Sequence, residues 1–330
     1  MKEAFKLNNL ILAISIMHPE FFELSEISKY VDLITIQAFE KLRTPLDPTT
    51  SHPTDMDLKS RNNILKVVED IIKAGASAEK LILGLGTTAQ TSELSETCEW
   101  NLASATNNKG GVAGPFTKAS GFLAYYEVCA LTWKNHVCTA LSPVSAPYGS
   151  TAKDFVAYDS EESIAFKIKK IVMAKNLKGV AFWALDYDDF IGEACKNGKY
   201  PLVKAAIQTL RNEELKKATC RNKYSCGDAP EGVKPPIDPS RYHRICYFTN
   251  WAQYRTNEAK FDITKNFEEG LCSHMMYAFG KVEEKADGKF AIAPYEYNDI
   301  KVGYPKVSDF DRNYLRHYFK KSHCVAFLIL

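Results

Sequence analysis

Short apolar runs alternate with stretches of helical periodicity along much of the chain. The runs occupy residues 10–17, 31–36, 81–85, 180–185, 245–250 and 275–279. Runs of this length, rich in β-branched residues and bounded by glycine or polar residues, are typical of strands with both faces buried. We therefore expect six buried strands, the first of them close to the start of the chain.

Three further stretches carry apolar residues on one helical face. Their apolar positions are Ile64, Leu65, Val68, Ile71 and Ile72 in the first, Ile164, Ile168, Ile171 and Val172 in the second, and Leu202, Val203, Ala206, Ile207 and Leu210 in the third. Gly75 and Gly179 are natural stops for the first two helices, and Asp159 and Ser160 are candidate N-caps of the second. Helices that alternate with buried strands predict a parallel α/β fold, either a (β/α)8 barrel or an open doubly wound sheet.

Two stretches interrupt the alternation. Residues 91–158 hold three cysteines, many glycines and an aromatic cluster at Phe122, Tyr125 and Tyr126, so we interpret them as an inserted subdomain. Residues 211–241 are first charged and then rich in proline, which is typical of a linker. The residues that follow, 242–330, are too few for another complete barrel.

Composition narrows the classes of protein. The 330 residues are 45% hydrophobic, which excludes a disordered, collagen-like or coiled-coil chain. The 42 basic and 40 acidic residues nearly balance, so no global charge favours nucleic acid as a partner. No apolar run is long enough to cross a membrane. Aromatic residues make up 12%, which favours stacking on flat ligands, although a large core would use the same residues.

Nine cysteines are scattered without a Cys-x-x-Cys pair or zinc-finger spacing, so we expect neither a metal site nor a cofactor. Their wide spacing is typical of disulfides in an oxidising compartment, which predicts a secreted protein. The alternative is a set of buried thiols in a cytosolic enzyme, and the lack of an Asn-x-Ser/Thr sequon gives secretion no support. Residues 10–17 lack the flanks and cleavage site of a signal peptide, so we interpret them as a strand.

Several segments resemble one family. Residues 179–190 (GVAFWALDYDDF) resemble the last-strand signature of family 18 glycoside hydrolases, the chitinases and chitinase-like lectins, and residues 121–129 (GFLAYYEVC) resemble part of the insertion domain of that family. The sixth and seventh strands of the family are similar to residues 31–40 and 80–86, and its first and second strands to residues 246–255 (CYFTNWAQYR) and 272–279.

The order of these segments implies an unusual organisation. Residues 1–210 resemble the C-terminal half of a family 18 domain, a partial (β/α)8 TIM barrel with strands five to eight and an α+β insertion domain. Residues 242–330 resemble the first two strands of a second barrel, so the resemblance implies a fragment of a tandem, multi-domain protein. Because strand eight neighbours strand one in a closed barrel, the second piece can pack its strands beside residues 180–185.

The resemblance also shows what the chemistry lacks. The acid of the family lies in a D-x-x-D-x-D-x-E motif on strand four, and no such motif is present in a matching context. Asp186, Asp188, Asp189 and Glu193 imitate it only loosely, so we assign no catalytic residue. Where the family reads Met-x-Tyr-Asp, residues 37–40 read QAFE, and Phe39 lacks the hydroxyl that orients the acetamido group of the sugar. Residues 88–90 (TAQ) replace a Tyr-Gly-Arg motif.

The resemblance implies a set of substrate-binding residues, namely Trp183, Phe39, Glu40, Tyr247, Trp251 and Phe279. Trp183 is expected to form the floor beneath a sugar; the alternative is a tryptophan of the barrel core, and ordinary core packing is an equal alternative for Phe279. The resemblance also implies the disulfides Cys129–Cys195 and Cys246–Cys272. Cys220–Cys226 is suggested by proximity, a Cys98–Cys138 pair is a guess, and Cys324 is left over.

Three functions remain open. The first is the binding of chitin or N-acetylglucosamine oligosaccharides without catalysis, by an extracellular protein of carbohydrate metabolism. The second is a true chitinase whose catalytic strand is missing from a truncated chain. The third is a secreted structural or allergen-like protein without a sugar site.

Overall fold

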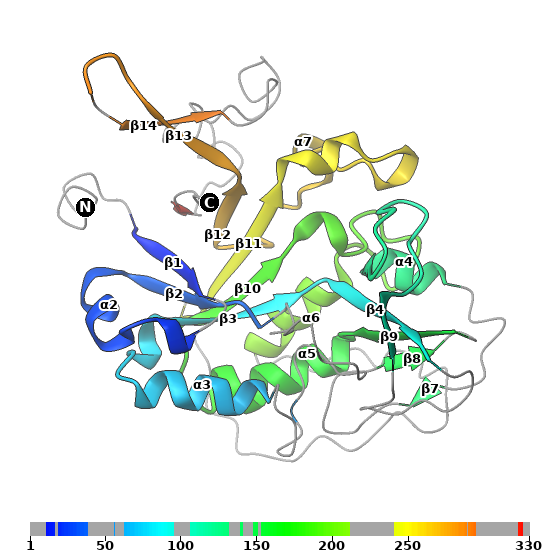
Figure 1. Cartoon of the computed structure of the whole chain (residues 1–330), viewed down its shortest axis with the longest axis horizontal. Helices are drawn as coiled ribbons and strands as arrows, with labels where there is room; N and C mark the ends of the chain where they lie inside the picture. Colours follow the sequence, from blue (N-terminus) through cyan, green and yellow to red (C-terminus); the bar gives the residue numbers. More distant parts are fainter. Residues whose placement is uncertain are drawn as a thin grey trace.

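The core of the protein is a curled sheet of seven parallel strands, in the order β1-β2-β3-β10-β11-β12-β15 (Figure 1). The computed structural model describes residues 11–16, 19–38, 56, 63–95, 106–131, 139–140, 148–150, 153–211, 241–288, 290–294 and 323–325. The strands of this sheet are β1 (Ala13–Ile16), β2 (Leu33–Ile36), β3 (Leu81–Gly86), β10 (Gly179–Trp183), β11 (His243–Thr249), β12 (His274–Ala278) and β15 (His323–Val325). The six strands predicted from apolar runs are all present, and β15 is an additional strand that the apolar pattern did not predict.

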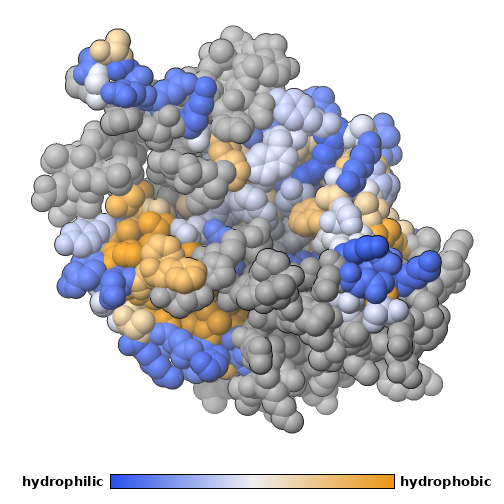
Figure 2. Space-filling model, in the orientation of Figure 1, coloured by the Kyte–Doolittle hydropathy of each residue, from blue (hydrophilic) through white to orange (hydrophobic). Residues whose placement is uncertain are grey.

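Burial separates the outermost strand β1 from the interior of the sheet. Every residue of β2, β3 and β12 is buried, as expected for strands covered on both faces. In β1 only Ile16 is buried, because among the described residues β1 pairs with β2 alone. The expectation of a fully buried first strand was therefore wrong. Apolar surface gathers over the region of β1, β2 and α2 (Leu24–Tyr30), where Phe21 is 77% and Phe22 45% exposed (Figure 2).

Helices lie together below the sheet in the view of Figure 1. They are α3 (Ile64–Lys73), α5 (Glu161–Lys167) with the π-helical turn η4 (Ile168–Met173), and α6 (Pro201–Leu210). Ser160 is the N-cap of α5, whereas the other candidate, Asp159, accepts a hydrogen bond from Ser163 and pairs with the buried Lys167. Gly75 follows α3 at φ +97°, a left-handed conformation that favours glycine.

The residues between β3 and α5 in the sequence, which include the stretch interpreted as an insertion, form a second, antiparallel sheet. Its strands run in the order β5-β4-β9-β8-β7, and β6 pairs with β4. The bounds are β4 (Thr88–Leu94), β5 (Thr106–Gly110), β6 (Phe122–Ala124), β7 (Thr139–Ala140), β8 (Tyr148–Ser150) and β9 (Asp154–Tyr158). The helix α4 (Tyr125–Ala130) follows β6 directly. Since β4 begins two residues after β3 ends, the carboxyl end of β3 leads straight into this sheet.

The segments on the two sides of residues 212–240 join in one parallel ladder. Phe182 of β10 lies opposite Cys246 of β11, and the amide of His243 donates to the carbonyl of Lys178 at 2.8 Å. This confirms the prediction that the second piece packs beside the strand at residues 180–185. Aromatic residues from both sides meet in a single hydrophobic core, where the Phe190 and Phe261 rings are 5.0 Å apart.

The remaining elements follow β11 and β12. The turns η7 (Asn250–Tyr254) and η8 (Asn257–Ala259) and the short helix α7 (Ile263–Asn266) connect the two strands. The hairpin β13 (Gly280–Glu284) and β14 (Phe290–Pro294) extends away from the sheet in Figure 1. Within the described residues, no helix is long and apolar enough to cross a membrane.

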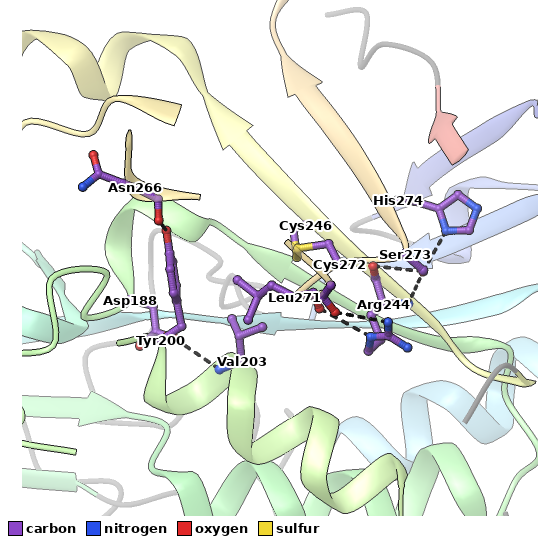
Figure 3. Close-up of a disulfide and its surroundings, with 11 residues drawn as sticks. Asp188, Tyr200, Val203, Arg244, Cys246, Asn266, Leu271, Cys272, Ser273 and His274 are labelled. Atoms are coloured by element: carbon purple, nitrogen blue, oxygen red, sulfur yellow. Dashed lines mark hydrogen bonds between the residues drawn. A yellow bond between two sulfur atoms is a disulfide. The ribbon is translucent and has the colours of Figure 1, made fainter. Parts of the chain in front are cut away.

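Two predicted disulfides are confirmed. Cys129 bonds to Cys195 with their Cα atoms 4.9 Å apart, which ties α4 to the loop before α6. Cys246 bonds to Cys272 with a Cα separation of 5.9 Å (Figure 3), which ties β11 to the residues before β12. Cys220 and Cys226, and likewise Cys98 and Cys138, lie outside the described residues, whereas Cys324 lies in β15 opposite Met275.

Candidate functional site

Four aromatic side chains meet at the carboxyl ends of β10, β11 and β12. Trp183 is the last residue of β10, Tyr247 lies in β11, Trp251 in η7, and Phe279 directly after β12. The ring centroid of Trp183 lies 5.1 Å from that of Tyr247, 6.4 Å from that of Trp251 and 6.3 Å from that of Phe279. Trp251 and Phe279 are stacked at 5.3 Å with 27° between their planes. We call these four residues the aromatic cluster.

Exposure distinguishes three rings of the aromatic cluster from fully buried residues of the core. Trp183, Trp251 and Phe279 are each only half-buried, whereas Phe182 beside Trp183 is fully buried. Trp183 also packs against the hydrophobic core, so both its sugar-binding role and the alternative of a core tryptophan stay predictions. Adjacent parallel strands end at one edge of a sheet, and ligands of such folds bind at that edge.

Tyr247 lies deeper than the other three rings. Its side chain is 1% exposed, and burial raises the pKa of its hydroxyl, while Ser15 of β1 and Thr35 of β2 act in the opposite direction. Gln37 donates from its amide to the Ser15 hydroxyl at 2.7 Å. Polar side chains from the N-terminal strands therefore approach the aromatic cluster from within the sheet.

A buried ion pair lies beside the cluster. Arg255 donates from Nη2 to Asp186 Oδ2 at 2.7 Å and from Nη1 to the Asp186 carbonyl at 2.8 Å. Its guanidinium lies 4.3 Å from the ring centroid of Tyr187. Burial raises the pKa of Asp186, and Arg255 acts against that rise. For Arg255, burial lowers the pKa, but Asp186, Tyr126 and Tyr187 together act in the opposite direction, and the net direction is upward.

Three of the four acidic residues that imitate a catalytic motif, the aspartates, have structural partners, whereas Glu193 is exposed. Asp188 accepts from the amides of Asp189 and Val203, and so caps the first turn of α6, and burial raises its pKa to about 7. Asp189 accepts from the amides of Gly192 and Cys195 at 2.8 and 2.7 Å. Since Asp186 is held by Arg255, all three aspartates are committed to the fold.

A pocket of about 470 Å³ adjoins the cluster on the side of Trp251. Its lining residues are Phe116, Thr117, Lys118, Ala119, Phe122, Tyr187, Trp251, Tyr254, Arg255 and Thr256. We call it the side pocket. The buried carboxylate of Glu127 anchors the insertion loop that forms one wall, because it accepts from the amides of Phe116 and Thr117 at 2.8 and 2.9 Å. A ligand seated on Trp251 therefore has access to a second preformed recess.

The sequence did not indicate the Arg255–Asp186 pair, and two of the predicted sugar-binding residues are not tested by the structure. Arg255 closes the segment that resembles the first strand of the family, yet nothing in its local pattern indicates a partner 69 residues away. Phe39 and Glu40 lie outside the described residues. Gln90 lies in β4, opposite Phe122 and Ala157 of the second sheet.

The chain is similar to known proteins in both sequence and fold. A profile of "Glycosyl hydrolases family 18" matches residues 1–188. "Probable chitinase 10" of Drosophila melanogaster is 26% identical over 84% of this chain, which corresponds to 14% of that protein. "Chitinase-3-like protein 2" of Homo sapiens is 31% identical over 57% of this chain and 50% of its own length. The chain thus spans half or less of these two relatives.

Two solved structures share the fold. Catalytic domain 2 of the Ostrinia furnacalis Group II chitinase superposes with a TM-score of 0.59 at 26% identity, covering 64% of this chain and 58% of that one. Human YKL-39, described as a pseudo-chitinase with retained chitooligosaccharide binding properties, gives a TM-score of 0.57 at 27% identity and covers 63% of this chain and 62% of its own.

Proposed function

Because the chain belongs to glycosyl hydrolase family 18, we propose that its aromatic cluster binds chitin-type oligosaccharides without hydrolysing them. The observation that carries the proposal is the convergence of three half-exposed rings, Trp183, Trp251 and Phe279, within 6.4 Å of one another. The chair form of N-acetylglucosamine presents C–H bonds on its flat faces and polar groups around its edge. Exposed aromatic faces supply the apolar surface that such a ring needs.

The proposal of binding without catalysis rests on the contacts that the carboxyl groups after Trp183 make within the fold. Hydrolysis of a glycosidic bond requires a carboxylic acid held beside the leaving oxygen. Asp186, Asp188 and Asp189 are the acidic residues nearest in sequence to Trp183, and each is spent on structural contacts. The retained oligosaccharide binding that describes the human pseudo-chitinase supports the same combination here.

The disulfides Cys129–Cys195 and Cys246–Cys272 support an extracellular location for this activity. We further propose that residues 1–210 and 242–330 derive from two successive domains of a tandem protein, with residues 211–241 as the linker. The similarity of the chain to a Drosophila protein of which it covers only 14% supports that organisation.

A fluorescence titration tests the proposed binding. We expect N-acetylglucosamine oligomers to change the tryptophan emission and to saturate, and Trp183→Ala to lose most of the affinity. Phe22→Ala serves as the control, because Phe22 is an exposed aromatic side chain outside the cluster. A wild-type protein whose emission and calorimetric signal do not respond to millimolar oligomer would exclude the function.

A second candidate, true hydrolysis, is favoured by the similarity to a solved chitinase catalytic domain. The same protein is therefore incubated with the oligomer, and the products are separated. Shortened oligomers that appear with wild type and disappear with Trp183→Ala would establish the enzyme in place of the lectin.

A further inference from the structure

Arg255 and Asp186 join the two pieces of the chain at the point where the aromatic cluster is assembled. Arg255 comes after residues 212–240 and Asp186 before them. The guanidinium makes two hydrogen bonds to Asp186, at 2.7 Å to the carboxylate and 2.8 Å to the carbonyl. The Arg255 side chain is 9% exposed and that of Asp186 is fully buried, so water competes little for this pair.

Each residue of the ion pair is close in sequence to one tryptophan of the aromatic cluster. Asp186 follows Trp183 by three residues, within the turn η5 (Leu185–Tyr187) that leaves β10. Arg255 follows η7, the turn that carries Trp251. Arg255 also lines the side pocket and lies over the ring of Tyr187, another lining residue of that pocket. The pair thus links the turn after Trp183 to the turn that contains Trp251.

The chemistry of the guanidinium makes this link directional. A planar guanidinium that donates to two oxygens fixes both distance and orientation, whereas an ammonium at the same place supplies a point charge with rotatable donors. A buried ion pair does more for specificity of arrangement than for net stability in some proteins. Here the arrangement that it specifies is the spacing of the Trp183 and Trp251 rings, 6.4 Å between centroids.

We propose that Arg255 is a positioning residue of the oligosaccharide cleft, which sets the spacing between Trp183 and Trp251 through its two hydrogen bonds to Asp186. The inference rests on the proposed function for its effect on affinity. Its effect on the ring spacing is independent of any ligand. Arg255 therefore acts through the tryptophans, and the lysine substitution separates this role from that of a charge alone.

A second ion pair across the same junction offers a matched control. Lys204 of α6 lies 2.7 Å from Glu268, and both side chains are more than a third exposed. This pair joins the same two pieces, but neither residue lines the side pocket. If weakening any contact between the two pieces of chain were sufficient, substitutions in both ion pairs would have the same effect. An effect on the aromatic cluster is expected only when Arg255 is changed.

The test compares Arg255→Lys, Arg255→Met and Lys204→Met in the full chain. The first readout is circular dichroism without ligand, where the exciton signal of the Trp183–Trp251 pair is assigned through its loss in Trp251→Phe. The second is affinity for an N-acetylglucosamine hexamer, and urea unfolding confirms that each variant is folded. We expect Arg255→Lys to reduce the exciton signal and weaken binding at least threefold, Arg255→Met to weaken it at least tenfold, and Lys204→Met to change neither by more than twofold.

The outcomes separate the two proposals. If Arg255→Lys behaves like Lys204→Met in both readouts, charge alone is sufficient and the positioning role is overturned. If the wild-type protein binds no oligomer but Arg255→Lys still loses the exciton signal, the positioning role stands and the proposed function fails. A wild-type protein that binds, with Arg255→Lys unchanged in affinity and exciton signal, retains the function and rejects the inference.

Discussion

The hydroxyl of Tyr200 donates a hydrogen bond to the carbonyl of Asn266 at 2.8 Å, which joins the start of α6 to the end of α7 (Figure 3). The ring of Tyr200 is fully buried, so this bond is formed inside the protein rather than across its surface. It belongs, with the β10–β11 ladder and the Arg255–Asp186 pair, to the contacts that make one core from two pieces of chain.

Tyr200→Phe removes this bond and keeps the ring. We expect the free energy of unfolding to fall by about 0.5–1.5 kcal/mol, the usual net contribution of one hydrogen bond. Urea unfolding measures the change, and Tyr30→Phe is the control because Tyr30 is 61% exposed. Equal midpoints for Tyr200→Phe and wild type would show that the hydroxyl contributes nothing to docking.

Trp251 belongs both to the aromatic cluster and to the side pocket, so its truncation affects two contacts with one ligand. Trp251→Ala is expected to weaken oligomer binding by about 2 kcal/mol, the size of an interface hot spot, which is roughly thirtyfold. Trp251→Phe keeps a stacking ring and is expected to lose less than half of that. Calorimetric titration with the hexamer gives both values, and equal affinities for the two variants would contradict a stacking role.

Asp188 makes stability depend on pH. Burial raises its pKa from 3.8 to about 7, so the folded protein holds a proton over a range where the unfolded chain has lost it. The stability that protonated Asp188 contributes to the folded protein is fully present below the pKa of 3.8 in the unfolded chain. It is lost as pH rises through the folded-state pKa of about 7. Asp188→Asn, which keeps an oxygen for the Val203 amide, removes the titration.

Urea midpoints at several pH values between about 4 and 8 test this expectation. The midpoint of wild type is expected to fall relative to that of Asp188→Asn as pH increases. Parallel pH profiles for the two proteins would show that Asp188 is already ionised in the folded state.

Lys118 is expected to make the side pocket sensitive to the charge of a bound sugar. It is exposed, and together with Arg255 it supplies the two charged side chains of the lining. A deacetylated sugar carries an ammonium group, so a glucosamine oligomer is expected to bind more weakly than its acetylated counterpart. The affinity ratio between the acetylated and the glucosamine oligomer is expected to fall about two- to fivefold in Lys118→Glu, which is the size of an exposed charge interaction.

Salt and a remote lysine control this prediction. High ionic strength screens exposed charges and is expected to narrow the difference in wild type as well. Lys285→Glu changes the net charge equally at the exposed turn of the β13–β14 hairpin and is expected to leave the ratio unchanged. The same ratio in Lys118→Glu and Lys285→Glu would assign the discrimination to the overall charge.

The sequence predicts the strands of the main sheet well, because a strand buried on both faces needs a continuous apolar run such as residues 81–85. The resemblance predicts Trp183, Tyr247, Trp251 and Phe279 as sugar-contacting residues, but it assigns Trp183 to one domain and the other three to a second. That the four rings meet depends on the packing of β11 against β10. The sequence predicts neither the partial exposure of β1 nor the addition of β15, because both depend on which strands are neighbours. The Arg255–Asp186 pair depends on the packing of the second piece and has no local signal.

The ladder between β10 and β11 holds together the segments before and after residues 212–240. Both disulfides described lie within one side of the junction, Cys129–Cys195 before it and Cys246–Cys272 after it. Backbone hydrogen bonds, buried aromatic contacts and the Arg255–Asp186 pair therefore hold the cleft together without a described covalent crosslink. A single cut of the backbone between residues 212 and 240 is therefore expected to leave two chains that stay associated without a described covalent bond, with Trp183 on one chain and Trp251 on the other.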